Sequence, residues 1–92
     1  MGVCIYMVRS GDWLRPVDEW TGLAGNKALF RNLENLPTEH PDGITASDQY
    51  LVRPGSFAPW FEFVSTLPNA SVFAEMLKRI EADPSLWLEF SY

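Results

Sequence analysis

Hydrophobic residues follow two different spacings along this 92-residue chain. At residues 3–9 both alternate sets of side chains are apolar, which predicts a strand covered on both faces and therefore a central one. At residues 86–92 apolar and more polar residues alternate, which predicts a strand with one buried face. A shorter run at residues 49–53, stopped by Pro54 and Gly55, predicts a third strand.

Three segments show the spacing of amphipathic helices. Residues 27–36 and 70–82 each gather apolar side chains on one stripe and charged ones outside it, which predicts helices that end at Pro37 and at Asp83. Residues 56–67 are ambiguous, because their aromatic and β-branched content favours a strand whereas their apolar period favours a helix. We interpret this segment as a helix and keep the strand as the alternative.

Two segments lack a regular period. Residues 12–25 have no clear spacing, except that Pro16 predicts a short helical turn over residues 17–20. Residues 37–48 are polar and rich in turn-forming residues, which predicts a long surface loop. The chain is thus expected to be one mixed α+β domain over residues 1–92, with a small sheet of about three strands, helices packed on it, and the order β–α–β–α–α–β.

Charge narrows the range of partners. Twelve acidic residues against seven Lys and Arg give a net charge of −5, and the acids are spread over both halves of the chain. A negative surface repels phosphates, which disfavours nucleic acid and anionic membranes, and it attracts basic proteins. No apolar run approaches the length that spans a bilayer. The single cysteine, Cys4, excludes an intrachain disulfide and indicates a reducing, cytoplasmic location.

Cys4 and His40 are the candidates for nucleophilic or metal chemistry. Cys4 lies inside an apolar run, where a buried, inert thiol is the simpler interpretation. His40 stands between Glu39 and Asp42, but a stable transition-metal site usually needs three or four ligands. Phosphate-binding loops, dinucleotide motifs and serine nucleophile motifs are missing from the sequence. We therefore predict no catalytic residue, no bound metal and no cofactor.

Two segments are candidates for binding a partner. Residues 12–20 combine acids with Trp and Arg, the residue types favoured at interface centres. Residues 37–48 form an acidic loop. The alternative interpretation is that the tryptophans cover a small core and that the loop is an ordinary connector. The candidate residues are Asp12, Trp13, Arg15, Asp18, Glu19 and Trp20 in the first segment and Glu39, Asp42 and Asp48 in the second.

Small size, negative charge, abundant aromatic residues and missing catalytic motifs favour a non-catalytic protein-binding domain. An inhibitor or immunity-type protein that caps a basic surface of another protein is one example. The alternative is a self-associating structural or accessory subunit, such as a homodimer, whose aromatic surface is covered by copies of itself. A small enzyme that uses His40 or Cys4 is the third hypothesis.

Overall fold

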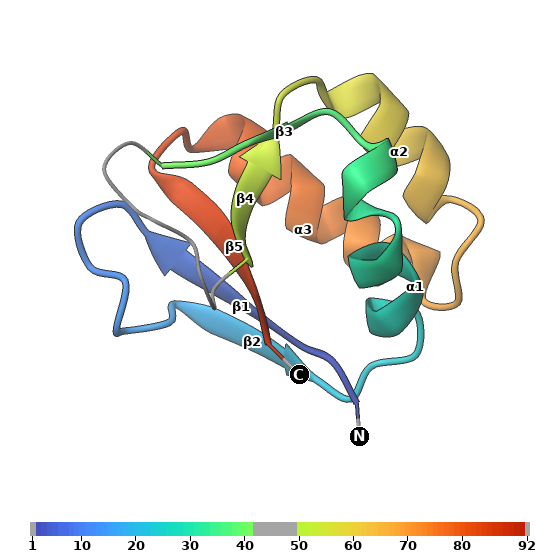
Figure 1. The fold of residues 1–92 in the computed structure, drawn as a ribbon, viewed down its shortest axis with the longest axis horizontal. Coiled ribbons are helices and arrows are strands. Elements are labelled where there is room, and N and C mark those ends of the chain that lie inside the picture. Colours follow the sequence, from blue (N-terminus) through green and yellow to red (C-terminus); the bar gives the residue numbers. More distant parts are fainter. Residues whose placement is uncertain (1, 42–49, 92) are drawn as a thin grey trace.

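The computed structural model describes residues 2–41 and 50–91, and within them the chain has a mixed α+β fold. Five strands of the described chain form one antiparallel sheet in the order β2-β1-β5-β4-β3. The strands are β1 (Cys4–Arg9), β2 (Asp18–Thr21), β3 (Thr38–Glu39), β4 (Tyr50–Pro54) and β5 (Leu86–Ser91). The helices are α1 (Asn26–Arg31), α2 (Phe57–Val64) and α3 (Ala70–Ala82), and a short 3-10 helix, η1 (Leu33–Asn35), follows α1. Figure 1 shows these helices together on one side of the sheet.

One face of the sheet, which we call the core face, packs against the helices. Ile5 lies opposite Phe90 and Met7 lies opposite Leu88 in the β1–β5 ladder. All four side chains are at most 1% exposed. Burial of such side chains is the main stabilising contribution to a domain of this size. Their helical partners in the core are Leu29 from α1, Trp60 and Val64 from α2, and Phe73, Met76, Leu77 and Ile80 from α3.

The opposite face, which we call the open face, carries the other alternate positions of the strands. Cys4 and Tyr6 of β1 and Trp87 and Glu89 of β5 lie on it, and all four are half-buried. The sequence correctly predicts residues 3–9 as an interior strand, because β1 lies between β2 and β5. The helices cover the core face of this strand, and on the opposite face Val8 of β1 and Leu51 of β4 are also at most 1% exposed, so the prediction of a strand with apolar burial on both sides is confirmed in part.

The three-strand sheet and its element order need correction, because the sheet gains a strand in each aperiodic segment. Strand β2 occupies residues 18–21, where a helical turn is predicted, and pairs with β1 through Ile5 and Trp20. Strand β3 lies inside the predicted loop of residues 37–48 and pairs with the end of β4. In both cases the neighbouring strand supplies the pattern that the short segment lacks, so tertiary pairing decides its conformation.

The helical predictions are largely confirmed. Helix α3 spans the predicted residues, and the ambiguous segment 56–67 contains helix α2, which makes the strand alternative wrong. The predicted helix over residues 27–36 is split, because α1 ends at Arg31 and η1 follows. In the described part of the chain, no helix combines the length and the apolar character needed to cross a membrane.

Asn26, the first residue of α1, fixes the end of β2 in place. Its buried side-chain amide donates hydrogen bonds to the carbonyl oxygens of Val3 (2.9 Å) and Trp20 (3.0 Å). Gly25 precedes it with φ of 105°, a left-handed conformation that other residues rarely adopt. These contacts tie the first two strands to the first helix.

Candidate partner-binding site

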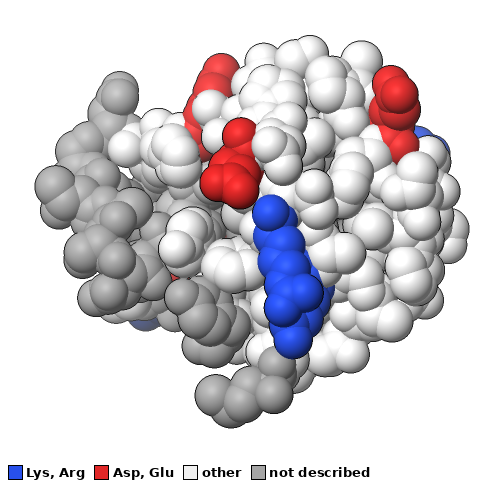
Figure 2. All heavy atoms as spheres, turned by 45° about the vertical axis from the view of Figure 1, so that its right-hand side comes forward, with Lys and Arg blue, Asp and Glu red and all other residues white. Residues whose placement is uncertain are grey.

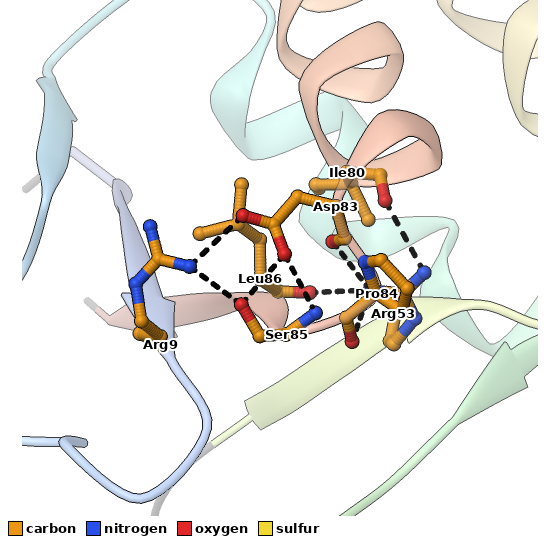
Figure 3. A network of polar contacts seen from close by, with 7 residues as sticks. All are labelled: Arg9, Arg53, Ile80, Asp83, Pro84, Ser85 and Leu86. Atoms are coloured by element: carbon orange, nitrogen blue, oxygen red, sulfur yellow. Dashed lines mark hydrogen bonds and ion pairs between the residues drawn. The ribbon is translucent and has the colours of Figure 1, made fainter.

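A polar network fixes the point at which β1 leaves the sheet (Figure 3). Arg9, the last residue of β1, donates hydrogen bonds to Asp83 Oδ2 (2.9 Å) and to Ser85 Oγ (2.6 Å). The Ser85 hydroxyl, followed by the Arg9 guanidinium, lowers the pKa of Asp83 to about 2. The N–H of Ser10 donates to the carbonyl oxygen of Ser85 (2.7 Å), so the chain beyond β1 starts from a fixed position.

Arg53 holds the same turn from the side of β4. Continuing the β4–β5 register by two residues places Pro54 opposite Leu86, and proline has no N–H to donate to that carbonyl oxygen. The Arg53 guanidinium donates instead, and it also lies 5.8 Å from the centroid of the Trp87 ring. It contacts the carbonyl oxygens of Leu86 (2.6 Å), Pro84 (3.1 Å), Ile80 (3.3 Å) and Asp83 (3.4 Å), as Figure 3 shows.

Residues 10–17, which we call the β1–β2 loop, are fixed along their length. The N–H of Asp12 donates to the carbonyl oxygen of Arg9 (2.9 Å), and the N–H of Val17 donates to that of Met7 (2.7 Å). Between these points the Trp13 ring packs edge-on against the ring of Trp87, with 6.1 Å between the centroids. The tip of the loop is therefore held by backbone and aromatic contacts on both sides.

Two apolar side chains project from this loop. Leu14 is 90% exposed and Val17 is 45% exposed. A groove of about 410 Å³ lies against the second of them and is lined by Pro16, Val17, Asp18 and Glu19. Single exposed apolar side chains are common on protein surfaces, whereas apolar side chains gathered beside a groove and rimmed by polar residues mark interaction sites.

Acidic residues precede and follow these apolar residues along the chain. Asp12 and Glu19 are exposed, and the described residues place no cation against either side chain. Asp18 is already paired, since Arg79 of α3 donates to its Oδ2 (2.6 Å). Its Oδ1 accepts the N–H of Glu19 (2.8 Å). The Arg79 guanidinium, followed by this backbone N–H, lowers the pKa of Asp18.

The tryptophans of the first candidate segment cover the fold. Trp20 is half-buried and packs against the core, and Trp13 packs against Trp87. Trp20 thus covers the core as the alternative interpretation expects, whereas Trp13 packs on Trp87 of the open face. Arg15 is exposed, and its described contact is a backbone hydrogen bond to Asp12 (3.4 Å).

Residues 37–41 are the described part of the second candidate segment. Glu39 is exposed in β3, at the opposite edge of the sheet from β2. Four strand spacings separate these edges, a distance of about 19 Å. Glu39 therefore does not share a surface with the first candidate segment. Asp42 and Asp48 lie outside the described residues.

Sequence reasoning missed the acidic row that adjoins β2 on the open face. Tyr6 lies opposite Glu19 in the β1–β2 ladder and opposite Glu89 in the β1–β5 ladder. Cys4 has the largest effect in raising the pKa of Tyr6, followed by burial and then by the two glutamates. Burial raises the pKa of Glu89. The alternation at residues 86–92 places Glu89 off the core, but the β2 pairing that brings Glu19 beside it has no local signal.

The two candidates for chemistry are kept apart by the sheet. Cys4 is half-buried in β1, whereas His40 follows β3, three strand spacings or about 14 Å across the sheet. The Nδ1 of His40 lies 3.1 Å from the carbonyl oxygen of Leu51, to which it donates when protonated. Within residues 2–41 and 50–91 no group of three or more His, Cys, Asp and Glu side chains is arranged to hold a metal ion.

Comparison of the chain with protein-family models, with curated proteins and with solved structures finds no match in any of the three. The proposal that follows is based on the geometry of the β1–β2 loop and of β2.

Proposed function

We propose that the protein is a non-catalytic protein-binding domain of the inhibitor or immunity type, which covers a basic surface of another protein. The binding surface consists of the β1–β2 loop and strand β2. The observation that carries the proposal is Leu14, which is 90% exposed at the tip of a loop held by fixed contacts. A leucine held in this way is a preformed anchor for a complementary pocket, and little conformational entropy is lost when it binds.

Electrostatics support a basic partner. Asp12 and Glu19 flank the apolar side chains, and the chain carries a net charge of −5. Charge of this sign increases the association rate with a cationic protein, and that increase falls as salt is added. Arg15 adds one positive charge at the loop and would contact an acidic group at the edge of such a surface.

The proposal is tested by photo-crosslinking from position 14 in an extract of the native cells. We expect a photoreactive residue at position 14 to capture a specific basic protein, and the same residue at exposed Glu75 of α3 to capture none. The purified partner should then bind Leu14→Ser and Glu19→Lys at least ten-fold more weakly, and less tightly at high salt. Glu75→Lys is the matched control for charge. Equal losses in Glu75→Lys and Glu19→Lys would contradict this surface.

A second candidate function, self-association, is favoured by the surface around α2. The stretch of residues 54–74 carries one charged residue, Glu62. Figure 2 shows a side of the molecule on which few of the described side chains are charged. Phe57, Phe61 and Phe63 are only half-buried there, although they pack partly on the core. An interface that repeats the same patch on both copies is disfavoured by like charges, and Glu62 is the one charged residue of this stretch.

Sedimentation of the isolated chain distinguishes the second candidate from the first. A dimer formed through α2 should dissociate in Ala58→Glu, which adds a charge to the exposed side of α2. Ala82→Glu on α3 is the matched control, because it makes the same substitution at an exposed helical position outside residues 54–74. A monomer at all concentrations contradicts self-association and leaves the first proposal standing.

A further inference from the structure

Strand β2 forms one edge of the sheet. It is four residues long, whereas β3 at the opposite edge has two residues. An edge strand presents backbone N–H and C=O groups with which another strand can pair. The edge at β2 is therefore the better of the two described edges for adding a strand.

The ladder contacts show which β2 backbone groups point outward. Met7 accepts the N–H of Val17, so the backbone groups of Met7 point toward β2. Successive residues of a strand point to opposite sides, so those of Tyr6 and Cys4 point toward β5. Glu19 lies opposite Tyr6 and Thr21 lies opposite Cys4. The backbone groups of both therefore point away from the sheet, at the two-residue spacing that an added strand requires.

Asp18 occupies one of these outward donors. Its Oδ1 accepts the N–H of Glu19 at 2.8 Å, where the carbonyl oxygen of an added strand would bind. Its Oδ2 is held by Arg79 at 2.6 Å, so the carboxylate keeps a partner when it releases the N–H. Around Thr21 the described residues supply no such substitute. The β2 edge is thus partly protected against pairing, because Asp18 accepts the N–H of Glu19. The carbonyl group of an added strand can still replace Asp18 there.

The surroundings of this edge favour a basic, extended occupant. The groove of about 410 Å³ lies along Pro16, Val17, Asp18 and Glu19, at the start of β2. The Glu19 carboxylate offers an ion pair to a Lys or Arg on the added strand, and Val17 offers an apolar contact. A second copy of this chain is a poorer occupant, because pairing of two β2 edges would bring the acids of both copies together.

We propose that an extended segment of the partner protein, rich in Lys or Arg, adds to the sheet as a sixth strand beside β2. It pairs with the backbone of Glu19 and Thr21 and displaces Asp18 from the Glu19 N–H. The inference rests on the proposed function and specifies the conformation and charge of the segment that is bound. Backbone pairing supplies affinity, and the acids select basic side chains.

The test uses a short peptide of alternating lysine and threonine as the probe. We expect the peptide to slow amide hydrogen exchange at Glu19 and Thr21 at least ten-fold. A peptide of the same sequence with every backbone nitrogen methylated keeps the charge, but its methyl groups prevent the close approach that strand pairing requires, so it should slow neither amide. Glu19→Lys should weaken binding of the unmethylated peptide at least ten-fold, whereas the matched control Glu75→Lys should bind normally.

The outcomes separate this inference from the proposed function. Equal binding of both peptides, with no slowed exchange at Thr21, would overturn strand addition and leave recognition by Leu14 intact. A different result would be slow exchange at Glu19 and Thr21 without any peptide, together with a dimer that Thr21→Pro abolishes. It would show that the strand added beside β2 comes from a second copy of this chain and not from a basic segment. Failure of both peptides to bind overturns strand addition. The crosslinking experiment at position 14 then decides the proposed function separately.

Discussion

Glu89 and Phe90 are neighbours on β5, and they show how differently the two faces of the sheet are built. Phe90 is 1% exposed on the core face, among side chains from the helices. Glu89 is half-buried on the open face, beside Tyr6 and in line with Glu19. Stability is concentrated on the first face, because apolar burial is concentrated there. The second face and the adjoining β2 edge can therefore carry unpaired acids without loss of the fold.

The strongest test of this comparison replaces the two neighbours separately. Phe90→Ala should lower the free energy of unfolding by about 4 kcal/mol, since it removes a buried aromatic ring and leaves a cavity. Glu89→Ala, the control from the open face, should change it by less than about 0.5 kcal/mol. Urea denaturation of both variants measures the difference. Similar losses in the two variants would show that the faces contribute equally.

A smaller loss of unfolding free energy is expected when Arg53, which holds the turn between α3 and β5, is replaced. Arg53→Met keeps much of the side-chain volume but removes the donors to the carbonyl oxygens around Leu86. We expect a loss of about 2 kcal/mol, as for other hydrogen bonds that involve a charged group. Arg15→Met, at an exposed position of the β1–β2 loop, is the matched control and should leave the denaturation midpoint unchanged. An unchanged denaturation midpoint in Arg53→Met would show that the hydrogen bonds of Arg53 do not stabilise the fold.

Acid should weaken the network that fixes the β1–β2 loop. The folded-state pKa of Asp83 is lowered from 3.8 to about 2, so its stabilising contribution is present above pH 3.8 and is lost as the pH falls toward 2. Asp18 has a lowered pKa as well, so it loses its contribution in the same direction. Asp83→Asn should reduce the slope of stability against pH in this range. A slope identical to that of the wild type would contradict the assignment.

The smallest expected change in unfolding free energy comes from Glu89 on the open face, and it is a gain where the other changes are losses. Burial raises the folded-state pKa of Glu89 above 4.5, so ionisation of this group costs stability as the pH rises through that value. Glu89→Gln should therefore raise the neutral-pH unfolding free energy slightly, by less than about 0.5 kcal/mol. The gain should vanish in acid, where the carboxyl is protonated in both states. Thermal unfolding at neutral and acid pH measures the change, and a loss at neutral pH would contradict it.

The sequence predicts the parts of the fold whose apolar period is long enough to be read. Helix α3 and strand β5 appear within a residue of their predicted bounds, because their buried residues recur at a single spacing. Strand β2 is missed because two of its four residues are acidic and its pairing partner lies on β1. A strand that is defined by its neighbour leaves little signal in its own residues.

The candidate site, like the fold, is predicted only where the signal lies in the residues themselves and not in their neighbours. Acids and aromatics at residues 12–20 direct attention to the loop that we propose as the binding surface, but they do not show which side chains project. Trp13 and Trp20 pack on the fold, whereas Leu14, the most exposed large apolar residue described, has no sequence signal of its own. Glu39 falls at the far edge because strand order, which depends on pairing across the chain, sets its place.

Strand β5 also has a consequence for how the chain folds. It lies between β1 and β4 and pairs with both, so the earlier strands form one sheet only after residues 86–91 reach them. Contacts of such long sequence separation slow the search for the native state. A nascent chain on the ribosome would expose the pairing edges of β1 and β4 until this segment emerged. Such a chain is vulnerable to aggregation or to chaperone capture during synthesis, a hazard that ends when β5 pairs.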